Sequence, residues 1–246
     1  MIRAGREYSP VQLEVLRWTV RLGAVTAEAV AQHCGWTPAS ARARLLAAER
    51  TGVLRRWRVL SGQPALFTVT RAGLRVSGLH GFEPCRVSVA GAPHAIACAG
   101  VAAALERAYP DHRVMGEREL RLHERESTAA LASACLGRGP GGAPLLHRPD
   151  LVLWPDGVRE RLPVAVEVEL TIKAPRRLVE ICRAWARCRC VAGTLYLAAP
   201  EVERPLARAI ERAQAGERIA LVQLDALADG DQRGREAGES TVPSGA

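Results

Sequence analysis

Carboxylates occur at alternate positions of residues 164–173, a run in which most of the other residues are apolar. Successive side chains of a β-strand point to opposite faces, so a strand here places the polar side chains on one face. That face carries Glu167, Glu169, Thr171 and Lys173, and Lys173 is the only lysine among the 34 basic residues. The same alternation fits a strand whose polar face is simply solvated, so its chemistry depends on what lies beside it.

Asp150 is the candidate partner for this face. It precedes residues 151–154, which we predict to form the preceding strand, and the Pro-Asp-Gly sequence at 155–157 is typical of a turn. A hairpin brings Asp150 toward the Glu167 side, where two carboxylates offer the hard oxygen ligands that Mg²⁺ and Mn²⁺ prefer. Such an ion activates water and stabilises charge on a phosphodiester. We therefore predict a metal site at Asp150 and Glu167, within a catalytic set that also holds Glu169 and Lys173.

The seven cysteines do not form the pattern of a secreted disulfide framework, because their number is odd and they are scattered along the chain. Three of them, at positions 182, 188 and 190, fall within a predicted helix at 175–190. On a helix, positions 188 and 190 point about 200° apart, so one ion is not easily held by both. We predict reduced thiols that pack in the core.

The excess positive charge lies entirely in the first 80 residues. The chain has a net charge of +8, and residues 1–80 hold twelve arginines and four glutamates. The remaining residues are balanced, with 22 basic and 22 acidic side chains. A concentrated positive surface attracts polyanions through counterion release, which makes double-stranded DNA the first candidate partner. A membrane is disfavoured, because this segment has no basic amphipathic helix with bulky apolar residues on one face.

Helix-start signals divide residues 1–80 into short helices. Ser9, Thr26 and Thr37 are typical N-cap residues, and a proline follows the first and third of them directly. Residues 53–60 and 65–70 then predict two strands around a Ser-Gly-Gln-Pro turn, and a further helix begins at a Thr-x-x-Gly element at 70–73. Three tight helices followed by such a two-stranded wing indicate a winged helix-turn-helix domain.

The third helix is the predicted DNA-reading element. At about 100° per residue, its outward side carries Ser40, Arg44 and Arg50, and small alanines between them let the helix approach base edges. Arg44 can donate two hydrogen bonds to a guanine edge. The wing arginines suit phosphate or minor-groove contacts, and they are Arg55, Arg56 and Arg58. The alternative is a winged helix that only contacts proteins, with arginines that are simply solvated.

Residues 94–227 alternate between helices and strands after a linker at 81–93. We predict helices at 94–108, 175–190 and 202–215, and strands at 151–154, 164–173, 194–197 and 219–224. Residues 112–122 predict a strand or a strand–helix junction, and residues 137–144 are so rich in glycine and proline that we predict a loop.

The predicted fold class is therefore an α+β winged helix-turn-helix domain at 1–80 followed by an α/β domain. The polar, glycine-rich tail at 228–246 is predicted to be disordered. No signal-peptide pattern and no long apolar run occurs, so we expect a cytoplasmic protein.

Pro149-Asp150, Glu167 and the order helix, strand, strand, helix, strand resemble the PD-(D/E)xK nuclease superfamily. The resemblance implies a nuclease-like α/β domain and assigns Asp150 and Glu167 to the first two acidic elements. It also implies that Glu119 matches an acidic residue contributed by the first helix. Position 169 departs from the pattern, because the superfamily usually has lysine there and this chain has glutamate. Lys173 can supply the missing charge.

The whole order from residue 9 to 224 resembles the replication-relaxation family of plasmids and other mobile elements. The matching pieces are the winged helix and four short segments at 94–97, 116–120, 149–153 and 166–170. The resemblance implies a role in DNA replication and relaxation.

Two hypotheses follow. In one, the winged helix selects a DNA site and the second lobe, with Mg²⁺ or Mn²⁺, cuts or holds the strand. In the other, the protein is a non-enzymatic transcription or replication regulator, and its degenerate nuclease-like lobe serves homodimerisation or DNA wrapping. Glu169 favours the second hypothesis, and the retention of Asp150, Glu167 and Lys173 favours the first.

Overall fold

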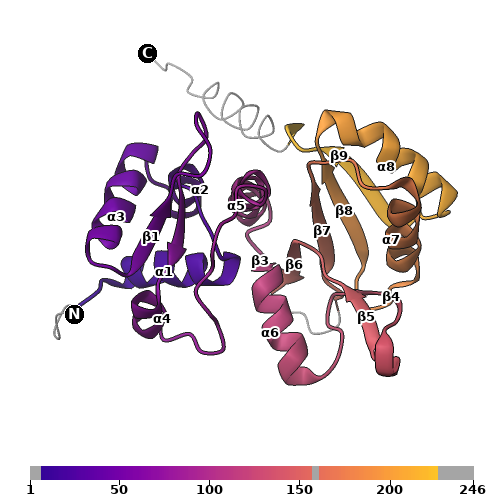
Figure 1. Ribbon diagram of the computed structural model, residues 1–246, viewed down its shortest axis with the longest axis horizontal. Helices are drawn as coiled ribbons and strands as arrows, with labels where there is room; N and C mark the ends of the chain where they lie inside the picture. The colour runs from indigo at the N-terminus through magenta and orange to yellow at the C-terminus, as the bar shows by residue number, and fades with distance from the viewer. Residues whose placement is uncertain (1–6, 157–160, 227–246) are drawn as a thin grey trace, which may run out of the picture.

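The computed structural model describes residues 7–156 and 161–226 of the chain (Figure 1). The predicted disordered tail at 228–246 lies outside these residues. The structure is mixed α/β, with a five-stranded mixed sheet. None of the helices in the described ranges is long and apolar enough to cross a membrane.

The N-terminal lobe consists of short helices and one hairpin. Its elements are α1 (Pro10–Leu22), α2 (Ala27–Cys34), α3 (Pro38–Arg50), β1 (Leu54–Trp57), β2 (Leu66–Val69) and α4 (Arg71–Ser77). The predicted N-caps are confirmed, because Ser9, Thr26 and Thr37 each accept a hydrogen bond from a backbone N–H in the first turn. β1 and β2 pair antiparallel, with Leu54 opposite Val69.

The Thr-x-x-Gly element closes this lobe. The Thr70 side chain accepts a hydrogen bond from the backbone N–H of Gly73 and donates one to the carbonyl of Gly52. A Cβ on Gly73 would lie 2.2 Å from the carbonyl oxygen of Val53 and 2.6 Å from a methyl group of Val69. Glycine is therefore required where α4 crosses the start of the hairpin.

The second lobe is built on the five-stranded sheet, in the order β3-β6-β7-β8-β9. β3 (His112–Gly116), β6 (Leu151–Pro155) and β7 (Val164–Glu169) are antiparallel neighbours. β8 (Gly193–Ala198) and β9 (Ile219–Gln223) continue parallel to β7. α7 (Pro175–Arg187) and α8 (Pro200–Arg212) make the crossovers and pack on one face, whereas α5 (Ala92–Ala108) covers the other (Figure 1). α6 (Glu117–Ser127) follows β3 directly.

Three sequence expectations need correction. Residues 137–144 are not only a loop, because β4 (Ala134–Arg138) and β5 (Pro144–His147) pair as a hairpin around a short 3-10 turn, and the glycines sit in that turn and in a bulge. The strand at 164–173 ends at Glu169, because the chain leaves the sheet there to begin α7 at Pro175. The helix at 175–190 ends at Arg187, so Cys188 and Cys190 follow it.

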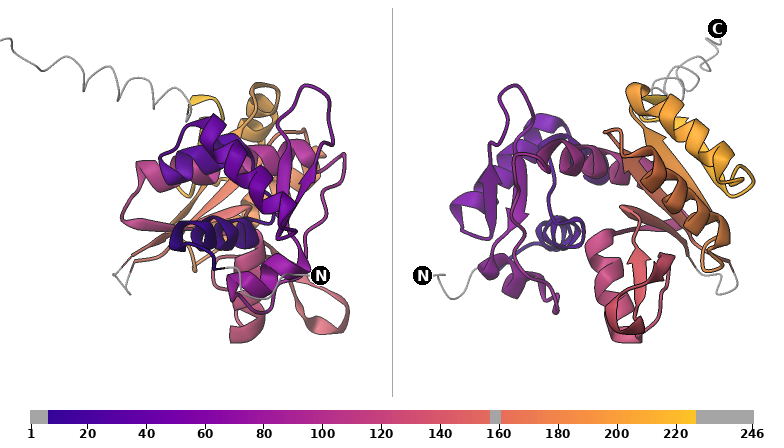
Figure 2. Two further views of the ribbon diagram at one scale, coloured as in Figure 1. Left: turned by 90° about the vertical axis from the view of Figure 1, so that its left-hand side faces the viewer. Right: turned by 45° about the vertical axis from the view of Figure 1, so that its right-hand side comes forward.

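One hydrophobic cluster extends across both lobes. α5 packs between α2 and the sheet (Figures 1 and 2), and the cluster that contains Val30 of α2 and Ala102 of α5 also contains Val166 of β7. Glu106 of α5 accepts a hydrogen bond from the Trp18 indole, 2.8 Å away, and lies 2.6 Å from Nδ1 of His33. The predicted linker at 81–93 therefore joins lobes that are packed together.

Candidate functional site

Basic side chains line the outer side of α3. Arg44 and Arg50 are exposed and Ser40 is half-buried, whereas Ala41 and Leu45 on the opposite side are buried in the lobe core. The guanidinium of Arg44 lies over the Trp36 ring, 4.4 Å from its centroid. This stacking holds the guanidinium at the helix surface without neutralising it. The predicted outward face of this helix is therefore solvent-accessible.

The β1–β2 hairpin carries three further arginines. Arg55 and Arg58 are exposed, and Arg55 lies over the Trp57 ring at 4.3 Å. Arg56 is half-buried and forms an ion pair with Glu49 of α3, 3.3 Å away, which ties the hairpin to the helix. Arg56 and Arg58 also line a hollow of about 550 Å³ below the hairpin turn. The arginines of α3 and of the hairpin, which we call the basic surface, thus lie on neighbouring elements that the Arg56–Glu49 ion pair joins.

Glu167 is buried on the α7 side of the sheet. Its Oε1 accepts a hydrogen bond from the Trp185 indole at 3.0 Å and lies 2.8 Å from Nε2 of His147 on β5. Burial raises the pKa of this carboxyl, and the contact with His147 opposes that shift. The sequence analysis missed His147 and Trp185, because nothing in their local patterns links them to β7.

Glu169 and Glu119 are also buried, and both have basic partners. Glu169 bonds the ammonium of Lys173, which lies beyond the end of β7 and folds back toward it. Glu119, on α6, pairs with Arg113 of β3 and lies 3.5 Å from Arg21 of α1. Glu119 therefore joins the two lobes.

Asp150 contacts both β7 and α5. Its Oδ2 accepts a hydrogen bond from the backbone N–H of Val168 at 2.8 Å and lies 3.2 Å from Nε2 of His94. His94 is in the first turn of α5, so Asp150 and Glu167 contact partners that approach from opposite faces of the sheet. The pairing of Leu151 with Val166 brings both residues to the same end of the sheet. The predicted approach of the two carboxylates to a shared ion stays a prediction.

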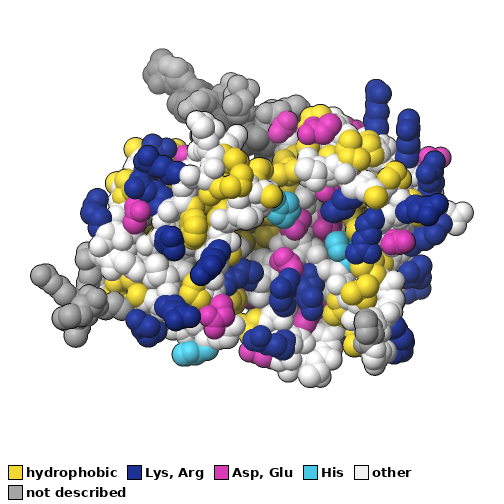
Figure 3. Space-filling model, viewed as in Figure 1, with side chains coloured by type: hydrophobic (Ala, Val, Ile, Leu, Met, Phe, Trp, Pro, Cys, Tyr) yellow, Lys and Arg dark blue, Asp and Glu magenta, His cyan; other side chains and the backbone are white. Residues whose placement is uncertain are grey.

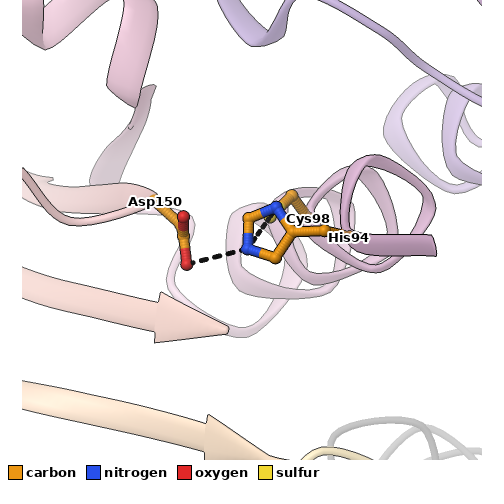
Figure 4. Close-up of side chains that lie close together, drawn as sticks. All are labelled: His94, Cys98 and Asp150. Atoms are coloured by element: carbon orange, nitrogen blue, oxygen red, sulfur yellow. Dashed lines mark hydrogen bonds and ion pairs between the residues drawn. The ribbon is translucent and has the colours of Figure 1, made fainter. Parts of the chain in front are cut away.

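Cys98 completes a group with His94 and Asp150 (Figure 4), which is a cluster that the sequence analysis did not identify. Its Sγ lies 3.6 Å from Nδ1 and 3.7 Å from Nε2 of His94. The hydrogen bond with Asp150 raises the pKa of His94. The available signal was the spacing of four between a histidine and a cysteine on a predicted helix, but Asp150 is distant in sequence.

The group opens into a pocket of about 180 Å³, which we call the interlobe pocket and which is also lined by Cys85, Arg86, Ser88 and Arg118. Figure 3 shows acidic and histidine side chains gathered in the middle of one face of the molecule, with basic side chains on both sides.

The predicted Mg²⁺ or Mn²⁺ site at Asp150 and Glu167 can be compared with these surroundings. Mg²⁺ prefers an octahedral set of oxygen ligands. Beside the Asp150 carboxylate, however, lie an imidazole and a thiol, and the Glu167 carboxylate is engaged by His147 and Trp185. This donor set fits Mg²⁺ poorly and suits an ion that accepts nitrogen and sulfur.

Comparison with models of known protein families gave no match for this chain, and a search of curated proteins also gave none. The resemblance to the replication-relaxation family therefore stays a prediction.

Proposed function

We propose that this protein binds double-stranded DNA through α3 and the β1–β2 hairpin, as a winged helix. The observation that carries the proposal is the set of exposed arginines on these neighbouring elements, which lie in the segment that holds all of the chain's excess positive charge. A helix of this kind enters the major groove, and an adjacent hairpin contacts the backbone.

The side chains on α3 suit this role. Ala39 and Ala43 are exposed beside Arg44, so small side chains leave room for the helix to approach base edges. Arg44 is held over Trp36 with its donors available, which reduces the side-chain entropy lost when it binds a guanine. Arg55 and Arg58 on the hairpin are placed for phosphate contacts.

The test measures duplex binding by the full-length protein, because the lobes share a core. Replacing both Arg55 and Arg58 with alanine is expected to weaken binding and to flatten its salt dependence. Arg183→Ala on α7 is the matched control, since Arg183 is also an exposed arginine and lies on the other lobe. Equal effects of the double variant and the control would contradict the proposal. The stoichiometry of the complex distinguishes one bound copy from a homodimer.

A second candidate function is metal-dependent cleavage of DNA during replication or relaxation of a mobile element. The observation that favours it is the placement of Asp150 and Glu167 at the same end of neighbouring strands, with Asp150 lining the interlobe pocket. The lobe also contains, in this order among other elements, the helix, two strands, helix and strand of the nuclease resemblance, namely α5, β6, β7, α7 and β8. Nicking of supercoiled plasmid with Mg²⁺, Mn²⁺ or Zn²⁺, lost in Asp150→Asn while duplex binding persists, is the expected result for a nuclease. No nicking with any of these ions supports the regulator hypothesis.

A further inference from the structure

We infer that His94, Cys98 and Asp150 form a binding site for Zn²⁺ or a similar divalent ion, with one coordination position open to the interlobe pocket. The inference does not depend on DNA binding, because the three residues lie outside the basic surface of α3 and the hairpin.

The spacing of the ligand atoms fits a tetrahedral ion. With Zn–N, Zn–O and Zn–S bonds of about 2.05, 2.1 and 2.3 Å, tetrahedral angles require about 3.4 Å between nitrogen and oxygen and about 3.6 Å between nitrogen and sulfur. In the structure, Nε2 of His94 lies 3.2 Å from the Asp150 oxygen and 3.7 Å from the Cys98 sulfur. All three ligand atoms lie within 4.8 Å of one another. A tetrahedral ion places the Asp150 oxygen about 3.6 Å from the Cys98 sulfur, so within the 4.8 Å limit these two atoms adjust and the half-exposed His94 ring turns when an ion binds.

The fold holds these side chains in place from two directions. His94 and Cys98 are four residues apart on α5, so they share one face of the helix. Asp150 is fixed at the start of β6 by the hydrogen bond from the Val168 backbone. α5 packs between α2 and the sheet, which limits how far His94 and Cys98 can move from the Asp150 carboxylate. A site on such rigid elements needs little reorganisation to bind an ion.

The chemistry of the ligands selects the ion. One imidazole, one thiolate and one carboxylate match the nitrogen, sulfur and oxygen donors of zinc sites, whereas a thiolate is a poor ligand for Mg²⁺ or Ca²⁺. Three protein ligands leave the fourth position for water, as in catalytic zinc sites, and that position faces the pocket lined by Arg86 and Ser88.

The experiment uses the full-length, metal-free protein with Zn²⁺, and with Co²⁺ as a spectroscopic probe. We expect one ion per chain, with the visible spectrum of tetrahedral Co²⁺ and a thiolate-to-cobalt band in the near ultraviolet. Cys98→Ser is expected to abolish the thiolate band and to weaken Zn²⁺ binding by more than the roughly 10–100-fold that loss of an outer partner costs. Cys85→Ser is the matched control, because Cys85 lines the same pocket but lies outside the group.

Two results would overturn the inference. One is the absence of stoichiometric Zn²⁺ binding by the wild-type protein. The other is a thiolate band that survives Cys98→Ser but disappears when Cys188 or Cys190 is replaced, since this would place the ion at the neighbouring sulfurs of that pair. Should Cys98→Ser fail to fold, His94→Gln and X-ray absorption of the wild-type Zn²⁺ form, with one sulfur and the rest nitrogen and oxygen, decide the question.

Discussion

Arg44 provides the sharpest test of how α3 contacts DNA. If its guanidinium reads a guanine edge, Arg44→Ala is expected to cost about 1–3 kcal/mol on the preferred site, or roughly 5- to 150-fold in affinity. The affinity for a random duplex should fall much less. If Arg44 contacts a phosphate instead, Arg44→Ala weakens binding to both kinds of duplex equally. The slope of log affinity against log salt then becomes shallower by the amount expected for about one phosphate contact.

The salt slope itself follows from the basic surface. Among the described residues, Arg44, Arg50, Arg55 and Arg58 have no ion pair with an acidic group, whereas Arg56 is paired with Glu49. Four phosphate contacts give a slope of about −3.6 in log affinity against log salt, which is a loss of about 150-fold between about 50 and 200 mM salt. If Arg44 reads a base, only the other three arginines contact phosphates, and the slope becomes shallower, at about −2.7.

The assay is fluorescence anisotropy with a selected duplex and a random duplex at several salt concentrations. Wild type, Arg44→Ala and Arg183→Ala are compared, with circular dichroism as a check of folding. Unchanged binding of both duplexes by Arg44→Ala would refute the assignment of α3 as the reading helix. Binding without salt dependence would refute the electrostatic reasoning as a whole.

Three further predictions concern groups that the structure buries. Glu106→Ala leaves the buried Trp18 indole N–H unpaired, so urea unfolding should show a loss of about 1–3 kcal/mol in one cooperative transition, and two separate transitions would contradict a shared core. Burial raises the pKa of Glu167 in the folded protein above its ordinary value of 4.5. This carboxyl therefore contributes most to folding stability below pH 4.5, and the contribution is lost as the pH rises through the raised pKa. As the pH rises over this range, the free energy of unfolding of Glu167→Gln, measured by urea titration, should therefore increase relative to that of wild type. A difference between the two proteins that does not change with pH would contradict the prediction. The hydrogen bond from Cys190 lowers the pKa of Cys188, so the midpoint of Cys188 alkylation against pH, followed by mass spectrometry, should lie below that of an ordinary thiol and shift upward in Cys190→Ala. An unshifted midpoint would rule out the thiol pair as the cause.

Local signals predicted most of the elements. The N-caps at Ser9, Thr26 and Thr37 act within one helical turn, so the sequence alone located the starts of the first three helices. The β4–β5 hairpin was missed because its strands are only five and four residues long and the intervening glycines resemble an ordinary loop. The end of β7 was misplaced because alternation continues past Glu169, although the chain has already left the sheet.

The candidate site depends on contacts that sequence patterns do not encode. Alternation correctly put Glu167 and Glu169 on the same strand, but it did not identify their partners, which come from β5, α7 and the segment before α7. His94 was noticed only as the start of a helix. Its position opposite Asp150 follows from the packing of α5 against the sheet, which is a long-range feature.

The arrangement of helices limits how recognition and chemistry can be combined. α2 packs against α3 on one side and α5 on the other, so one helix separates the proposed reading helix from α5 (Figure 1). The interlobe pocket, which is lined by the first residues of α5, is therefore displaced from the bases that α3 reads. Because the shared core fixes the two lobes, this offset is built into the fold. A nuclease with this geometry cuts outside the footprint of α3, so cuts mapped inside that footprint would show that the pocket is not where the chemistry occurs.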